Sequence, residues 1–314
     1  MVETSVVVLN YNGKQHLRDC FESLEAQDYK DFEIIFVDNA SKDGSIEYVK
    51  KNYPKIKAIS NAKNLGFAGG NNTGMRAAKG EFVVILNNDT KADKSWLKNL
   101  VKEAKKHQLI GMCASKMVYF DNPEIMNSAG LQVSRNGRGK DIGIKELAKN
   151  HSKNKWVVGP CGGAALYKKE MLEDVKEGED YFDTSYFIYY EDLDLALRGQ
   201  SRGWRCRYVA DAVVYHKEGM DTSKVKGLGV TCGIRNKIYT IIKNWPTPVL
   251  VSSFPVVFLE QTASFLYYLI RLDGNATKAR LTMLKNIPRM MKKRKVIQKR
   301  RKSDISPLFC HNNL

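Results

Sequence analysis

The feature that most constrains the fold is an apolar segment, residues 82–86, that ends abruptly in Asn87, Asn88 and Asp89. Five consecutive apolar residues, three of them β-branched, are typical of a short strand buried on both faces of a parallel sheet. In open α/β sheets, ligands bind at the carboxyl ends of the strands. The three polar side chains are therefore candidate ligand contacts, and an ordinary turn before a helix is the alternative.

The first third of the chain alternates apolar runs of strand length with segments whose apolar residues have helical spacing. The runs lie at residues 6–9, 32–37, 56–59 and 82–86. This alternation predicts an α/β fold, with a mostly parallel, twisted sheet and helices on both of its faces. The glycine-rich residues 64–72 are predicted to form a loop before a helix, and residues 118–155 are predicted to form loops over the mouth of the active site.

Polar residues also follow the first two predicted strands: Asn10 and Asn12 after the first, Asp38 and Asn39 after the second. An acid at the end of the second strand is well placed to accept hydrogen bonds from a nucleoside. The first turn lacks a G-x-G-x-x-G pattern, which disfavours a nicotinamide or flavin cofactor, and the chain has no G-x-x-x-x-G-K-[ST] pattern, which excludes a P-loop. The glycines of residues 66–70 would let a nucleotide approach the backbone closely.

Two further motifs carry candidate chemistry. The pair Glu191-Asp192 follows an aromatic-rich run and stands at a predicted helix start. Carboxylates are favoured in a first helical turn by the helix dipole, which is the structural alternative. A positioned carboxylate can also act as a general base, and aromatic walls around it raise its pKa. His216 ends a short apolar strand, where most histidines are structural.

Four segments, in the same order, resemble motifs of the inverting family 2 glycosyltransferases, in particular their rhamnosyltransferase-like branch. They are VVVLNYNG at 6–13, VDNASKDGS at 37–45, NLGFAGGNN at 64–72 and LNND at 86–89. The resemblance extends over nearly the whole chain. It implies the GT-A fold, with a nucleotide-sugar-binding half at 1–117 and an acceptor half at 118–245.

The resemblance also implies roles for residues in the first half of the chain. Asp38 would contact the nucleoside, and Asn10, Tyr11 and Asn12 would line its pocket. The other residues that we predict to bind the nucleotide-sugar are Asn39, Asn64, Gly66, Gly70, Asn71, Asn87, Asn88 and Arg235. For Arg235, on a predicted helix, the expected contact is with a phosphate, and a solvated helix face is the alternative.

By the same resemblance, Asp89 would be the last residue of the family's metal-binding acidic triplet, and His216 would be a second ligand of Mg²⁺ or Mn²⁺. The first position of the triplet is Asn87 here, which leaves fewer charges on the cation. In the Glu191-Asp192 pair the second acid, Asp192, would be the catalytic base, and Glu191 would support acceptor binding.

The final 69 residues, 246–314, differ from the rest in composition: they carry +10 of the net charge of +17. An apolar stretch at 249–272 is interrupted by Pro255 and Glu260, and nine of the fourteen residues at 289–302 are basic. This combination predicts a monotopic anchor on an anionic membrane surface. A transmembrane helix is the alternative, and so is a helix docked on the catalytic domain with a disordered basic end.

Together these features predict a metal-dependent inverting glycosyltransferase on the cytoplasmic face of the cell membrane. The donor would be a nucleotide-diphospho-sugar, such as dTDP-rhamnose or a UDP-sugar, and the acceptor a lipid-linked or polysaccharide glycan. Six scattered cysteines without a CxxC pair, and a start without a signal region, fit the cytosol. A sugar nucleotidyltransferase is the alternative enzyme, but it would need a basic glycine-rich loop at 10–13. A nucleic-acid-binding protein is suggested by charge alone, so we predict no nucleic-acid partner.

Overall fold

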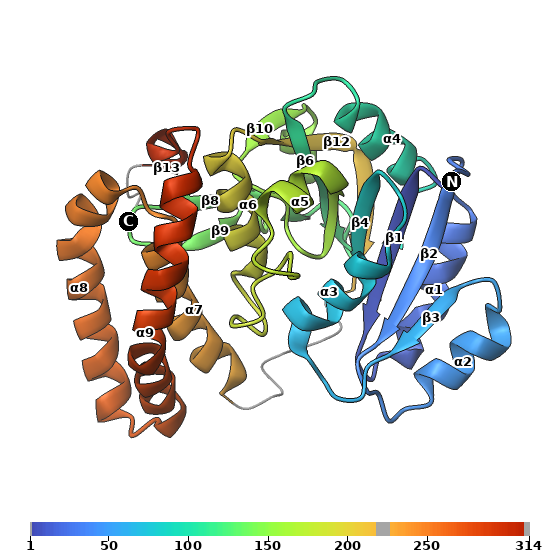
Figure 1. Cartoon of the computed structure of the whole chain (residues 1–314). Coiled ribbons are helices and arrows are strands. Elements are labelled where there is room, and N and C mark those ends of the chain that lie inside the picture. The colour runs from blue at the N-terminus through green and yellow to red at the C-terminus, as the bar shows by residue number, and fades with distance from the viewer. Residues whose placement is uncertain (1, 218–226, 311–314) are drawn as a thin grey trace.

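A ten-stranded sheet forms the centre of the molecule in the computed structural model, which describes residues 2–217 and 227–310. Its main path runs β10-β12-β6-β11-β4-β1-β2-β3, with β5 and β7 paired at its side (Figure 1). The first four strands are parallel, as the alternation of apolar runs predicts. They are β1 (Thr4–Asn10), β2 (Phe32–Asp38), β3 (Lys57–Ser60) and β4 (Phe82–Asn87).

Beyond β4 the sheet is mixed. Strand β11 (Ala164–Lys168) runs antiparallel both to β4 and to β6 (Ile110–Tyr119). Strand β12 (Arg205–His216) is parallel to β6 and antiparallel to β10 (Lys155–Val157) and β5 (Thr90–Ala92). The α/β fold is thus confirmed, and its second half contains the antiparallel pairs that the short apolar runs did not reveal.

Helices cover both faces of the sheet because alternate residues of the buried strands point to opposite faces. Val7 belongs to the core on the face covered by α3 (Gly66–Ala77), α5 (Lys169–Val175) and α6 (Glu191–Ser201), and its neighbours Val6 and Val8 belong to the core on the other face, which three more helices cover. Those are α1 (Lys14–Glu25), α2 (Ser45–Asn52) and α4 (Trp96–Ala104).

Two predicted loops have regular structure instead. Helix α3 begins at Gly66 within the supposed glycine-rich loop, because Gly70 and Gly74 let the helix lie against β1: a Cβ on Gly70 would be 2.5 Å from the side chain of Leu9. Residues 118–155 contain β7, β8, β9 and the short 3-10 helix η1. These elements span Met126–Ser128, Leu131–Ser134, Gly139–Asp141 and Ala148–His151.

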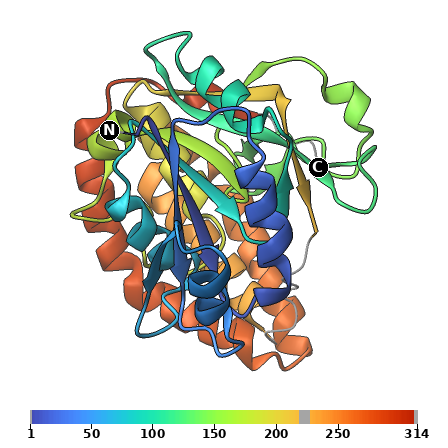
Figure 2. The same ribbon diagram turned by 90° about the vertical axis from the view of Figure 1, so that its right-hand side faces the viewer.

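Three helices follow the sheet: α7 (Leu228–Asn244), α8 (Thr247–Ile270) and α9 (Gly274–Arg300). They lie at the opposite end of the molecule from β1–β3, which stand in front of them in the turned view (Figures 1 and 2). The buried guanidinium of Arg294 on α9 donates to the carbonyl oxygens of Ile242 and Trp245. The chain then returns to the smaller three-stranded sheet through η3 (Ser306–Leu308), and β13 (Phe309–Cys310) pairs there with β8. The basic segment is therefore mainly a docked helix, and the domain boundary at residue 245 stays a prediction.

Candidate active site

The carboxyl ends of β4, β1 and β2 meet at one edge because these strands are neighbours in the sheet. At this edge the Nδ2 of Asn88 donates to the Oδ1 of Asn10 at 2.5 Å, and the Nδ2 of Asn10 donates to the Oδ1 of Asp38 at 3.2 Å. All three side chains are buried. The structure thus brings together polar residues that follow three different strands, as predicted.

The two turns after β1 and β2 are tied together by Ser41, a residue that the sequence analysis did not select. Its hydroxyl oxygen accepts from the Nδ2 of Asn10 at 3.1 Å and from the backbone N–H of Asn12 at 2.9 Å. Its own N–H donates to the second oxygen of Asp38 at 3.0 Å. Tyr11 is half-buried beside them. These bonds preorganise a polar wall of the kind that a nucleoside could use, and the nucleoside contact itself stays a prediction.

Asn39 and Asn64 connect this wall to the start of α3. The Nδ2 of Asn39 donates to the Oδ1 of Asn64 at 2.8 Å and to the carbonyl oxygen of Gly66 at 3.1 Å. The Oδ1 of Asn64 also accepts from the N–H of Gly66 at 2.8 Å, and Asn71 is turned back onto Phe67 within the helix. These amides hold the helix start in place, so their predicted contacts with the nucleotide-sugar remain to be tested.

The predicted metal ligands are adjacent. The Nε2 of His216 lies 3.3 Å from the Oδ1 of Asp89, and the Nδ1 of His216 lies 3.1 Å from the Oδ1 of Asn127 on β7. Because an amide oxygen only accepts, the Nδ1 of His216 carries the proton. In the neutral ring the Nε2 lone pair then faces the carboxylate of Asp89, and two acceptors that face each other accommodate a cation. An imidazole nitrogen and a carboxylate oxygen suit Mn²⁺ or Mg²⁺, so the residues fit the predicted metal.

The acidic pair lies where α6 begins. The Oδ2 of Asp192 accepts from the N–H of Gly162 at 3.0 Å, and its Oδ1 accepts from the N–H of Leu193 at 2.7 Å. Burial, helped by the charge of Asp141, raises the pKa of Asp192 to about 6 against the effect of these bonds. Burial and the neighbouring Asp192 also hold the pKa of Glu191 well above its usual value. Of the two carboxyls, Asp192 accepts two backbone hydrogen bonds that favour its charged form, whereas burial and Asp192 favour the neutral form of Glu191.

Asp141, at the end of β9, is a further acid near this site that the sequence analysis missed. Burial raises its pKa, while hydrogen bonds from Ser128 and Cys161 and the nearby His216 lower it. Asp141 in turn raises the pKa of Asp192, so this acid lies near both His216 and the candidate base. Nothing in its local sequence marked it, because its position depends on the pairing of β8 with β9.

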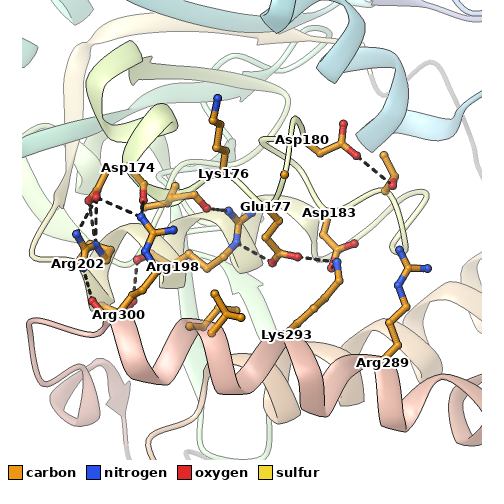
Figure 3. A pocket seen from close by; sticks show the side chains of 16 residues that line it. Asp174, Lys176, Glu177, Asp180, Asp183, Arg198, Arg202, Arg289, Lys293 and Arg300 are labelled. Atoms are coloured by element: carbon orange, nitrogen blue, oxygen red, sulfur yellow. Dashed lines mark hydrogen bonds and ion pairs between the residues drawn. The ribbon is translucent and has the colours of Figure 1, made fainter.

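A second carboxylate cluster, formed by Glu177, Asp183 and Asp194, has its oxygens close enough to hold a metal ion. In the structure, the ammonium groups of two lysines lie between these carboxylates, where a metal ion would otherwise bind. The fully buried Nζ of Lys243 lies 2.7 Å from Asp183, 2.9 Å from Asp194 and 2.8 Å from Glu177. Lys293 reaches in from α9 to Glu177 and Asp183, both at 2.6 Å (Figure 3). We therefore interpret this cluster as an ion-pair network rather than a metal site.

Arg235, on α7, contacts the loop before α6 and its own helix. Its guanidinium donates to the carbonyl oxygen of Tyr186 at 2.8 Å and to the Oδ1 of its neighbour Asn236 at 2.9 Å. It also lies over the ring of Tyr239, 5.7 Å from the centroid. These contacts place it against the loop that precedes α6, and its predicted phosphate contact stays a prediction.

Solved structures of glycosyltransferases share this arrangement of strands. TarS of S. aureus in complex with UDP-GlcNAc has a TM-score of 0.60 at 16% identity, over 96% of this chain and 93% of that one. A mannosyltransferase of Pyrobaculum calidifontis in complex with GDP-Man and Mn²⁺ has a TM-score of 0.55 at 19% identity, over 95% and 85%. The predicted GT-A fold is confirmed by these similarities.

Sequence comparison gives the family. The model of glycosyl transferase family 2 matches residues 5–176, more than half of the chain, and the chain belongs to that family.

Three relatives are named glycosyltransferases. An uncharacterised glycosyltransferase of Nostoc sp. is 30% identical over 55% of this chain and 53% of its own length. The amylovoran biosynthesis glycosyltransferase AmsB of Erwinia amylovora is 24% identical over 73% and 74%. The GalNAc(5)-diNAcBac-PP-undecaprenol beta-1,3-glucosyltransferase of Campylobacter jejuni is 27% identical over 58% and 57%. The chain thus spans about half the length of two of these relatives and about three quarters of the third.

Proposed function

We propose that this glycosyltransferase transfers a sugar, with inversion and with the help of a divalent cation, from a nucleotide-diphospho-sugar to a lipid-linked or polysaccharide acceptor. The observation that carries the proposal is Asp192, a buried carboxylate at the start of α6 that is held by the N–H groups of Gly162 and Leu193 and whose pKa is raised to about 6. The names of the Erwinia and Campylobacter relatives, which refer to a polysaccharide and to a polyprenol-linked glycan, support the acceptor class.

In the proposed reaction the acceptor hydroxyl attacks the anomeric carbon of the donor sugar. As the new glycosidic bond forms, the hydroxyl proton passes to the carboxylate of Asp192, and the bond from the anomeric carbon to the phosphate oxygen breaks. The nucleoside diphosphate leaves from the opposite face of the sugar, which inverts the anomeric centre. A base with a pKa near 6 is mostly ionised at pH 7 and still accepts a proton readily, which suits this step.

Asp89 and His216 would hold the divalent cation, which when bound neutralises the diphosphate of the donor. Asn127 would keep the ring of His216 oriented through its Nδ1. The structures with UDP-GlcNAc and with GDP-Man and Mn²⁺ support a nucleotide-diphospho-sugar and a divalent ion. Within that class the rhamnosyltransferase-like motifs favour dTDP-rhamnose or a UDP-sugar.

We also propose that α8 attaches the enzyme to the inner face of the cell membrane by lying in the interface. The helix is long and apolar enough to span a bilayer, and its large side chains, among them Phe254, Phe258 and Leu259, are exposed. The one charged residue near its middle, Glu260, pairs with Lys237 of α7 at 2.7 Å and accepts from Asn136 at 3.1 Å. Since these bonds hold the middle of α8 against the catalytic part, an interfacial position is more consistent with the fold than a spanning one.

The proposal is tested by incubating the full chain, bound to vesicles, with a panel of nucleotide-diphospho-sugars and Mn²⁺. We expect release of nucleoside diphosphate from one donor, abolished by a chelator and by Asp89→Ala. Asp211→Asn, at an exposed aspartate, is the matched control and should be fully active. Full activity in excess chelator would refute the role of the metal, and release of pyrophosphate from a nucleoside triphosphate would indicate a nucleotidyltransferase.

A further inference from the structure

The loop that leads into the candidate base has an unusual backbone. Three aromatic residues in it, Phe187, Tyr189 and Tyr190, have φ angles of 67°, 69° and 72°. Bulky side chains rarely adopt this left-handed conformation, and it persists only where the surrounding structure imposes it. Asp192 follows two residues after the last of them. The direction of its carboxylate therefore depends on whatever holds this loop.

Helix α7 makes several of the contacts that fix this loop. The side chain of Asn236 is fully buried, and the two hydrogens of its Nδ2 are shared among three carbonyl oxygens of the loop, those of Tyr186 at 2.9 Å, Ile188 at 2.8 Å and Tyr189 at 2.8 Å. Two turns further along the same helix, Lys243 pairs with Asp183 just before the loop and with Asp194 just after it. One helix thus contacts the loop before, within and after its strained part.

The opposite side of the loop rests on α3, in the donor-binding half. The N–H of Ala68 donates to the carbonyl oxygen of Phe187 at 3.1 Å, and Asn72 exchanges two hydrogen bonds with the backbone of Phe182, at 2.8 and 2.9 Å. A Cβ on Gly66 would be 2.5 Å from that same oxygen of Phe187. The loop is therefore fixed between α7 and the helix whose start is tied to Asn39.

We propose that Asn236 is a positioning residue: it sets the conformation of residues 186–190 and thereby aims Asp192 at the acceptor hydroxyl. The inference rests on the proposed role of Asp192 as the base. An amide suits the task because its NH₂ group donates to carbonyl oxygens and carries no charge. An aspartate would instead place a carboxylate against three carbonyl oxygens. An alanine would remove the side-chain donor from the oxygens of Ile188 and Tyr189, while that of Tyr186 would still accept from Arg235.

The test compares Asn236→Ala and Asn236→Ser with a core control on the same helix, Ile241→Val, which shares a hydrophobic cluster with Trp245 and whose side chain makes no hydrogen bond to the loop. We expect Asn236→Ala to lower kcat for transfer by roughly 10²-fold, the effect of a misplaced catalytic group, while the Kd for the nucleoside diphosphate stays within about twofold. The serine variant, which keeps one donor, should recover part of kcat. Ile241→Val should leave kcat unchanged at a similar loss of stability.

Two results would overturn the proposal: an unchanged kcat in Asn236→Ala, or a loss of kcat that Ile241→Val reproduces. Should the alanine variant not fold, the proposal can be tested by hydrogen exchange in the serine variant. We expect faster exchange that is confined to residues 186–193. An equal change in exchange throughout the protein would contradict the proposal. The variant Asp192→Asn separates the positioning role from the role of Asp192 as the base. If Asp192→Asn is fully active, the proposed function is refuted. If Asp192→Asn is inactive and Asn236→Ala has normal activity, only the positioning role is refuted.

Discussion

Replacing Lys243 by methionine should reveal how much the buried ion-pair network contributes to the free energy of unfolding. Methionine is close to lysine in shape, so the packing is kept and only the charge is lost. The ammonium group is fully buried and lies within 3 Å of Asp183, Asp194 and Glu177. Without it, three carboxylates share two cations, Arg198 and Lys293.

The expected loss is about 3–5 kcal/mol in the free energy of unfolding at pH 8, the usual cost of removing one partner from a buried ion pair. In the native protein Lys243 and its neighbours lower the pKa of Asp183 and Asp194, although burial opposes this, and these carboxylates raise the pKa of Lys243. The lowered pKa values of the carboxyls stabilise the fold above about pH 4, the usual pKa of an aspartate in the unfolded chain. The raised pKa of the lysine stabilises the fold below about pH 10, the usual pKa of a lysine there. The network therefore contributes its full stabilisation from about pH 5 to about pH 9.

In the variant, one carboxylate lacks its cation and its pKa rises, so protonation relieves the excess charge as the pH falls. The loss of stability should therefore be smaller at pH 5 than at pH 8. Urea unfolding at both pH values measures it. The matched control is Lys292→Met, which removes an exposed lysine from α9 and should change stability by less than about 0.5 kcal/mol. A loss below 1 kcal/mol at pH 8, or an equal loss at both pH values, would refute the reasoning.

Three further predictions concern the site and the membrane surface. Because the raised pKa of Asp192 is about 6, kcat/KM should fall as the pH drops below 6, and a profile that is flat from pH 5 to pH 8 would contradict this. Asn127→Leu, which frees the ring of His216, should weaken Mn²⁺ binding about 10–100-fold in a calorimetric titration, and unchanged affinity would exclude the supporting role. Phe258→Glu should reduce flotation with anionic vesicles, whereas Leu109→Glu, at another exposed apolar residue, should not; equal flotation of the two variants would dismiss α8 as the contact.

The parts of the site that follow strands could be predicted from sequence because strand ends converge by geometry. Asn10, Asp38 and Asn88 lie together for that reason, and the acidic pair does begin a helix. The direction of β11 could not be predicted, since a short run of apolar residues does not encode whether a strand runs parallel or antiparallel. The early start of helix α3 at Gly66 was missed because the packing of its glycines on β1 overrides their weak helix propensity.

The least predictable features depend on contacts between residues far apart in the chain. Asn236 and Lys243 lie on a helix that the sequence would allow to be half solvated, yet both are buried against a loop some fifty residues earlier. Arg294 belongs to a run of basic residues that resembles a free tail, and it is buried because backbone carbonyl oxygens at the end of α7 and just beyond it accept its hydrogen bonds. Charge counts along the sequence cannot distinguish a lysine that faces lipid from one that neutralises a buried acid.

The central claim, that Asp192 is the base of glycosyl transfer, is tested most directly by measuring transfer and donor binding together in Asp192→Asn and Glu191→Gln. The account predicts that Asp192→Asn binds the donor with unchanged Kd and loses transfer by roughly 10²–10⁴-fold, the usual contribution of a general base. Because burial and the neighbouring Asp192 raise the pKa of Glu191 and so favour its neutral form, Glu191→Gln should keep far more of the activity. An active Asp192→Asn beside an inactive Glu191→Gln would contradict the account.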